Sequence, residues 1–147
     1  MKKALTAVVA AAAVAAPVAS AAAATRHPVR KKVGTRVITV KKRVTGSPGS
    51  ADRWGIVQVT LIVKKTTTIV GQKKKVKRTP VAIRVPVYPN HTSRSIFINQ
   101  QAIPFLRQET LQAHFDLSKI NVISGATYTS YAFGQSLHSA LLKAKNV

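Results

Sequence analysis

The 147-residue sequence contains no cysteine, only three acidic residues and few aromatic ones. Without cysteine, the chain cannot form disulfides, attach c-type haem, ligate an iron–sulfur cluster through sulfur, bind zinc through thiolates or use a catalytic thiol. Because Asp52, Glu109 and Asp116 are its only acidic side chains, we expect neither a paired-carboxylate mechanism nor a cage for a hard cation. The four histidines show no metal-ligand spacing, so we predict no catalytic and no metal-ligating residues.

The shortage of acidic residues leaves 24 Lys and Arg residues and a formal net charge of +21, which predicts anionic partners. Two runs, 26–43 and 64–84, hold most of these cations, and such runs are typical either of a solvated face or of contact with an anion. The aromatic residues that could stack on bases lie outside both runs, so we expect no nucleic acid partner. An anionic envelope surface or an acidic redox partner is the expected contact.

The first 24 residues have the pattern of a secretory signal peptide. Lys2 and Lys3 precede an apolar run from Ala4 to Ala16, and small residues follow Pro17 up to Ala24. The apolar run is shorter than the roughly 20 residues that a spanning helix needs. We therefore expect residues 1–24 to be removed and the protein to be extracytoplasmic, in the cell envelope or secreted, at the membrane face of a bacterial envelope.

Residues 25–50 are interpreted as a basic leader or linker, with one possible edge strand over 36–40 and a turn-rich stretch over 45–50. The domain is expected over 51–147. Its first strand is indicated by alternating apolar residues from Val57 to Val63, and a second by the β-branched run 66–70. A turn and a solvated basic run follow over 71–75. The third strand covers 81–87, where Pro86 favours a sheet edge.

After the strands, the hydrophobic period becomes helical. Thr92 or Ser93 is expected to cap a helix that Pro104 either ends or follows with a second helix reaching His114. A last helix is expected over 128–143. The expected buried residues are Ile96, Asn99, Ala102 and Ile103, then Phe105, Leu106 and Leu111, then Phe133, Leu137, Ala140, Leu141 and Ala144. Strands followed by helices predict an α+β fold, with an antiparallel sheet from the N-terminal strands packed by the C-terminal helices.

The segment from Asn121 to Ser130 is the candidate for chemistry. A short extended run ends at Ser124, Gly125 permits a tight turn, and Thr127 lies where a helix should begin. The first turn of a helix has unpaired N–H groups and the positive end of the helix dipole, so it can hold a phosphate. Two interpretations are open: a phosphate-bearing ligand binds here or is esterified to Thr127, or Thr127 is an ordinary N-cap beside an ordinary turn glycine.

The stretch Ser124-Gly-Ala-Thr-Tyr-Thr-Ser130, continued to Leu141, resembles the C-terminal signature of the FMN-binding domain family. These extracytoplasmic flavin domains occur alone in exported bacterial proteins and as subunits of the sodium-pumping NADH:quinone oxidoreductase and Rnf complexes. The resemblance extends over residues 52–145. Its other matching segments are Trp54–Val59, Ser93–Ser95, Ile98–Asn99, Ala102–Pro104, Leu106 and Gln108–Leu111.

The resemblance implies that FMN is the cofactor and that a flavin transferase esterifies its phosphate to Thr127. It also implies that Ser124, Gly125 and Ala126 form the phosphate turn, while Thr129 and Ser130 add hydroxyl contacts. The protein would then be an electron-transfer domain rather than a stand-alone enzyme. It would need a redox partner, which we expect to be embedded in the membrane.

Two positions depart from the family pattern. Asn121 stands where the family usually has Asp, and Ala113-His-Phe115 stands where Ala-Gln-Ser is frequent. We expect His114 to cap the preceding helix rather than to line the flavin site. Asn121 and the high charge keep a second function open, a cationic cell-envelope binding protein on the same fold without flavin. An exported flavin reductase is less favoured, because about 95 residues leave little room for a substrate pocket.

Overall fold

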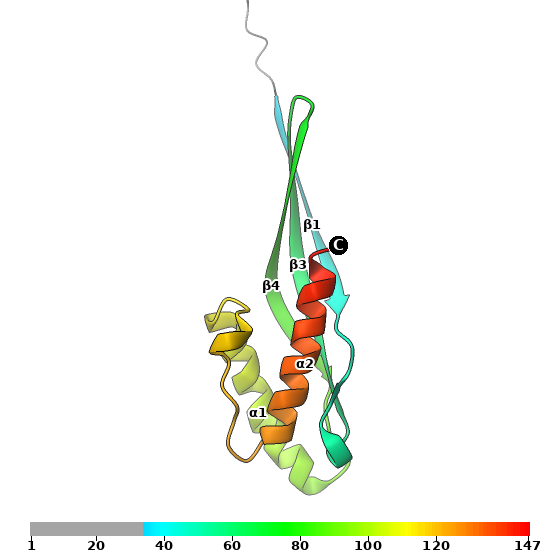
Figure 1. The fold of residues 1–147 in the computed structure, drawn as a ribbon, viewed down its shortest axis with the longest axis vertical. Coiled ribbons are helices and arrows are strands. Elements are labelled where there is room, and N and C mark those ends of the chain that lie inside the picture. Colours follow the sequence, from blue (N-terminus) through cyan, green and yellow to red (C-terminus); the bar gives the residue numbers. More distant parts are fainter. Residues whose placement is uncertain (1–33) are drawn as a thin grey trace, which may run out of the picture. The chain divides into compact units, whose positions relative to one another are not determined.

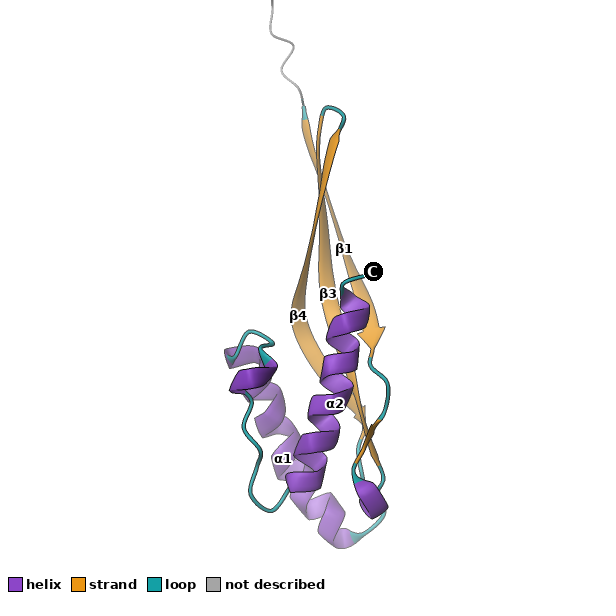
Figure 2. Ribbon diagram, viewed as in Figure 1, coloured by secondary structure: helices purple, strands orange, loops and turns teal. Residues whose placement is uncertain are grey.

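The structure, a computed structural model, describes residues 34–147, in which strands come first and two long helices follow (Figures 1 and 2). The predicted α+β fold, with an antiparallel sheet packed by C-terminal helices, is confirmed. The predicted signal peptide and the first part of the leader lie outside the described residues. The elements are β1 (Thr35–Thr45), β2 (Gly49–Ser50), β3 (Ile56–Val70), β4 (Lys73–Val87), α1 (Ser93–Gln112) and α2 (Thr127–Ala144), with short 3₁₀ turns η1 (Asp52–Trp54) and η2 (Leu117–Lys119).

Strand β3 is the centre of the sheet. It pairs in antiparallel fashion with β1 on one side and β4 on the other, while β2 pairs with its first residues. The alternating apolar residues from Val57 to Val63 are all fully buried, as their period of two predicts. The separate strand expected over 66–70 is instead the continuation of β3. Both neighbouring strands pair with this stretch, and the turn comes only at Gly71 and Gln72.

Strands β1 and β2, which lie before the expected start of the domain at residue 51, are part of the sheet. β1 pairs with β3 along its whole length, from Thr45 opposite Thr60 to Thr35 opposite Val70, so the predicted edge strand is present and belongs to the domain. The turn-rich stretch after it packs directly on α2. A Cβ atom on Gly46 or Gly49 would overlap a backbone carbonyl oxygen of that helix. These glycines allow the chain to pack closely on α2. Their presence in the sequence is equally typical of a flexible linker, so the sequence alone did not reveal this contact.

Helix α1 is one helix, so the break or restart expected at Pro104 is wrong. Its N-cap is Thr92, whose hydroxyl accepts a hydrogen bond from the Ser95 backbone N–H in a capping box. Pro104 lies on the exposed side of the helix, where water can satisfy the carbonyl that loses its partner. Ile96, Phe105 and Leu111 are exposed as well, against expectation, whereas Asn99, Ala102, Ile103 and Leu106 are buried.

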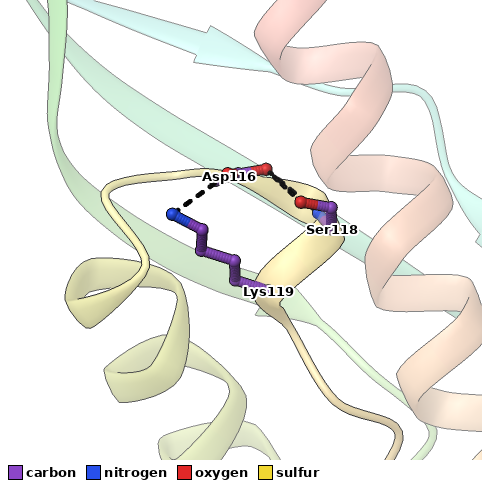
Figure 3. Close-up of polar contacts among 3 residues, drawn as sticks. All are labelled: Asp116, Ser118 and Lys119. Carbon is purple, nitrogen blue, oxygen red and sulfur yellow. Dashed lines mark hydrogen bonds and ion pairs between the residues drawn. The ribbon is translucent and has the colours of Figure 1, made fainter.

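The C-terminal end of α1 is a Schellman motif. His114 and Phe115 have φ angles of 53° and 63°, and the Phe115 N–H donates to the Thr110 carbonyl at 2.9 Å. His114 therefore terminates the helix, as expected, through its backbone conformation. Asp116 then caps η2 by accepting hydrogen bonds from the N–H and the hydroxyl of Ser118 (Figure 3).

Helix α2 supplies most of the helical side of the core. Phe133, Leu137, Ala140 and Ala144 are buried against the sheet as predicted, while Leu141 is half-buried. Its Ser136 hydroxyl accepts a hydrogen bond at 2.8 Å from the N–H of Val59, where the pairing of β3 with β4 is irregular. Neither α1 nor α2, the helices of the described region, is long and apolar enough to cross a membrane.

Candidate cofactor cleft at the start of helix α2

A cleft of about 360 Å³ lies at the N-terminal end of α2. Its volume falls in the range of roughly 300–1,000 Å³ that is usual for small-molecule sites. Four separate stretches of the chain contribute to it: η1, the segment after β4, the first turns of α1 and the start of α2. The lining residues are Arg53, Trp54, Pro89, Arg94, Ser95, Ile98, Asn99, Gly125, Ala126, Thr127, Tyr128 and Thr129.

The first turn of α2 faces this cleft with its backbone donors unpaired by the helix. Thr127 is the first helical residue, Ala126 is the N-cap, and no side chain caps the helix. The first helical hydrogen bond runs from the Ser130 N–H to the Ala126 carbonyl, so the three preceding N–H groups lack a helical partner. The reading of Thr127 as an N-cap is therefore wrong. Its hydroxyl is exposed and has no hydrogen-bond partner within residues 34–147.

Two arginines and a tryptophan ring determine the charge and the polarity of the cleft. The guanidinium carbon of Arg53 lies 5.2 Å from the centroid of the Trp54 ring, within the range of a cation–π contact. Arg94 lies on the first turn of α1, and no acidic residue lines the cleft. Trp54 is partly buried and packs on the hydrophobic core. The cleft therefore combines fixed positive charge with a flat apolar surface.

A buried chain of hydrogen bonds holds the walls of the cleft together. The Thr129 hydroxyl donates to the Asn99 side-chain oxygen at 2.8 Å, and the Asn99 side-chain nitrogen donates to the Pro89 carbonyl at 2.7 Å. These bonds connect α2, α1 and the segment after β4. Because its hydroxyl proton is already donated inside the protein, Thr129 lines the cleft mainly as a structural residue.

The structure brings together only part of the predicted site. Gly125, Ala126, Thr127 and Thr129 line the cleft, with Gly125 in a left-handed turn conformation at a φ angle of 81°. Ser130 does not line it. Its hydroxyl accepts from the Ile123 N–H at 3.1 Å and donates to the Ala126 carbonyl at 3.0 Å, which stabilises the turn.

Ser124 is exposed and also outside the cleft lining. Ser130 thus stabilises the turn, Ser124 lies next to it, and the residues between the two serines line the cleft.

Sequence reasoning missed eight of the lining residues, and the four considered next are Arg53, Trp54, Arg94 and Asn99. A signal was present, because all but Arg53 lie in segments that carry the family resemblance. Arg53 and Arg94 also lie outside the two basic runs, so the clustering of charge along the sequence does not indicate them. Local sequence could not indicate that η1 and α1 meet the start of α2.

The two positions that depart from the family pattern lie outside the cleft lining. The Asn121 side-chain nitrogen donates to the Glu109 carboxylate at 2.6 Å, and the other Glu109 oxygen is buried without a partner in the described region. Aspartate at position 121 would place a second negative charge against Glu109. Asparagine at position 121 instead donates a hydrogen bond to the Glu109 carboxylate and adds no charge.

A larger hollow of about 420 Å³ lies near the C-terminal end of α2. Val63, Phe115, Leu117 and Leu141 give it a mainly apolar lining, with His138 and two cations also present. It lacks a helix N-terminus and contains none of the predicted site residues. We therefore take the smaller cleft as the candidate site. No group of three or more potential metal ligands is found within residues 34–147.

The residues of the cleft fit FMN in chemical character. Helix N–H groups and two arginines suit a phosphate, and Trp54 offers an apolar surface to an aromatic ring system. No protein-family model, curated protein or solved structure matches the chain.

Proposed function

We propose that this protein is an exported electron-transfer flavoprotein that holds FMN in the cleft at the start of α2. One observation carries the proposal: three segments that resemble the FMN-binding domain family, far apart in sequence, all contribute residues to one cationic cleft. They contribute Trp54, the pair Arg94 and Asn99, and the turn from Gly125 to Thr129. A resemblance without functional meaning gives no reason for these segments to meet at a helix N-terminus.

Each part of the cleft has a defined task in this proposal. The backbone N–H groups at the start of α2, together with Arg53 and Arg94, bind the phosphate. Trp54 limits the access of water to the ring system and fixes its orientation. FMN, when bound, supplies one- and two-electron transfer. No acid–base residue of the protein is needed for that task, and the partner is a redox protein, proposed to be embedded in the membrane.

The exposed hydroxyl of Thr127 is the proposed attachment point. A flavin transferase would join the Thr127 oxygen to the FMN phosphorus of FAD. The pyrophosphate bond of FAD breaks, AMP leaves, and the hydroxyl proton passes to the leaving phosphate or to water. The chain contributes a hydroxyl that has no hydrogen-bond partner within residues 34–147, and the helix N-terminus stabilises the phosphate charge before and after transfer.

Intact-mass spectrometry tests the attachment. The protein is produced in a host with a flavin transferase, and we expect a mass increase of one FMN less one water. Thr127→Val keeps the side-chain shape and removes the hydroxyl, so the increase should vanish. Thr79→Val, which removes an exposed hydroxyl from the sheet, should retain it. Covalent flavin on the Thr127→Val chain would contradict the assignment.

Noncovalent binding is tested separately from attachment. With the unmodified chain, Arg53→Ala or Arg94→Ala should weaken FMN binding about tenfold, because each removes a charge-assisted phosphate contact. Arg107→Ala is the matched control, since Arg107 is exposed on α1 and does not line the cleft. A chain that is both unmodified and colourless would favour the alternative function, a flavin-free cationic binding protein of the cell envelope.

A further inference from the structure

The sheet has one face that no helix of the described region covers. Along β3 the buried side chains are all at odd-numbered positions, from Val57 to Thr67, and those from Val57 to Val63 belong to the core that β3 shares with α2. The even-numbered positions, from Gln58 to Val70, are half-buried or exposed. Because side chains alternate across a sheet, the even positions and their cross-strand partners form a single open face.

All charged side chains that the three long strands place on this open face are cations. Cross-strand register places on it seven basic residues from β1, β3 and β4, and all seven are exposed. Those three strands contain no acidic residue. We call this surface the cationic face, and its basic residues are Lys41, Arg43, Lys64, Lys73, Lys75, Lys77 and Arg84.

The arrangement is unfavourable within the protein itself. Lys41 lies directly opposite Lys64, and like charges in such pairs destabilise a sheet. Within residues 34–147 the only ion pair of an Asp or Glu side chain joins Asp116 to Lys119, and neither residue is on the sheet. On the opposite, helix-facing side of the sheet, Arg78 donates a hydrogen bond from Nε to the main-chain oxygen of Val147 at 2.7 Å. A local conflict of this kind, repeated along three strands without an internal counter-charge, is typical of a functional surface.

The cations continue onto the other side of the sheet where β1, β3 and β4 extend past the C-terminal end of α2 (Figure 1). Arg36, Lys42, Lys65, Lys74 and Arg78 occupy helix-facing register positions of these strands, and Arg78 lies beside the end of α2, where it lines a hollow with Lys145. Desolvation lowers the pKa of Lys65, and the charges of Lys42, Arg78 and Lys74 lower it further. This part of the sheet is therefore cationic on both sides.

The distribution of charge favours a flexible chain over a flat surface as the anion. A bilayer touches one side of a ribbon, whereas a linear polymer can follow both. Lys73, Lys75 and Lys77 stand at every second residue, roughly 7 Å apart along the strand, a repeat similar in length to an extended polyol-phosphate unit. The three strands of the cationic face contain no aromatic side chain for stacking on bases, but Thr66 and Thr68 of β3 lie opposite Lys77 and Lys75.

We propose that the cationic face, together with the cationic end of the sheet, binds a linear polyol-phosphate polymer of the cell envelope. The lysines and arginines contact phosphates, and the threonine hydroxyls of β1 and β3 hydrogen-bond to phosphate or polyol oxygens. This surface lies on different elements from the cofactor cleft. The proposal therefore does not depend on bound flavin, and it gives the domain a fixed location within the envelope.

The test uses a fluorescent poly(glycerol phosphate) oligomer as the probe. Lys73→Gln, Lys75→Gln and Lys77→Gln together should weaken binding at least about tenfold and reduce the slope of log K against log salt by about 2–3. The matched control, Arg107→Gln with Lys119→Gln, removes two exposed charges that lie on α1 and η2. It should bind as the unaltered protein does, whereas Lys75→Gln with Lys77→Gln, which removes the same charge from the sheet, should bind more weakly.

Three results would overturn the proposal. Equal weakening in the control and in the matched sheet variant would mean that net charge alone attracts the polymer. Tighter binding to anionic phospholipid vesicles would assign the surface to the membrane, and tighter binding to a single-stranded oligonucleotide of equal charge would assign it to nucleic acid. Thermal melting of each variant checks folding, and the sheet variant should melt no lower because its repulsion is reduced.

Discussion

Asp116 illustrates how one exposed carboxylate stabilises a turn in the segment that joins α1 to α2. It caps the short turn η2, and hydrogen bonds from the side chain and backbone of Ser118 are the main causes that hold the pKa of Asp116 below its ordinary value of 3.8 (Figure 3). Lys119, at 3.6 Å, adds a smaller favourable charge. After this turn the chain leads to Gly125 and the start of α2.

The lowered pKa makes this capping interaction dependent on pH. The unfolded chain binds the proton more readily than the folded one, so the stabilisation is complete above pH 3.8 and is lost as the pH falls through the lowered pKa. Ser118→Ala removes the main cause, and the pKa of Asp116 should rise toward 3.8. An NMR titration of the Asp116 carboxyl carbon measures this directly. An unchanged titration in the variant would contradict the assigned cause.

Residue type alone did not separate the hydroxyls of the candidate site. Thr127, Thr129 and Ser130 look equivalent in sequence, yet only the Thr127 hydroxyl is free of partners within the described residues. The difference comes from what α1 and the preceding turn provide. Asn99 accepts the Thr129 proton, and the Ala126 carbonyl accepts that of Ser130. Hydrogen-bond partners distant in sequence therefore decide which hydroxyl is available for chemistry.

At the scale of elements, periodicity predicted the strands and helices whose pattern is local. β3 and α2 bury the expected residues because an alternating or helical stripe faces a single core. Pro104 failed as a helix terminator because its position is on the exposed side of α1. β1 was predicted only as a possible short strand over 36–40, because an edge strand with Lys and Arg at many positions shows little hydrophobic alternation. The backbone pairing with β3 stabilises β1, although the sequence of β1 has little strand pattern of its own.

The contact between the β1–β2 connection and α2 leads to a test with two glycines. Gly49→Ala forces a methyl group against the carbonyl of Ala132, so we expect a loss of about 3 kcal/mol in the free energy of unfolding. Gly134→Ala, inside α2 with open space around it, should instead stabilise the protein by about 1 kcal/mol.

Urea denaturation monitored by circular dichroism measures both changes. If Gly49→Ala were as stable as the unaltered protein, residues 46–50 would be a free linker after all. The opposite signs expected for the two substitutions separate packing from a general effect of adding a methyl group.

For the molecule as a whole, the cofactor cleft and the cationic sheet lie on different elements and depend on different information. The cleft forms only when η1, α1 and α2 have packed together, so its arginines could not be assigned from local sequence. The charge of the sheet is visible in composition, but its division into faces follows from strand register. A domain that holds a redox cofactor at one site and an envelope polymer at another would keep its electron-transfer site in one compartment.

The uncompensated charge of the sheet should also appear in the stability of the whole protein. Salt screens repulsion among exposed cations, so raising sodium chloride from about 0.02 to 0.5 M should raise the melting temperature by roughly 5 °C. The triple Lys73, Lys75 and Lys77 to Gln variant should respond less, because fewer charges remain to be screened.

The stability of the protein should also depend on pH, and the direction of that dependence follows from Lys65. With the pKa of Lys65 lowered from 10.5, the unfolded chain binds more protons, so stability should rise as the pH increases from the lowered pKa toward 10.5. Differential scanning calorimetry at several salt concentrations and pH values provides the measurement. A melting temperature independent of salt would mean that the cations of the sheet do not repel one another appreciably, which would also remove a main reason to expect a polyanion on that face.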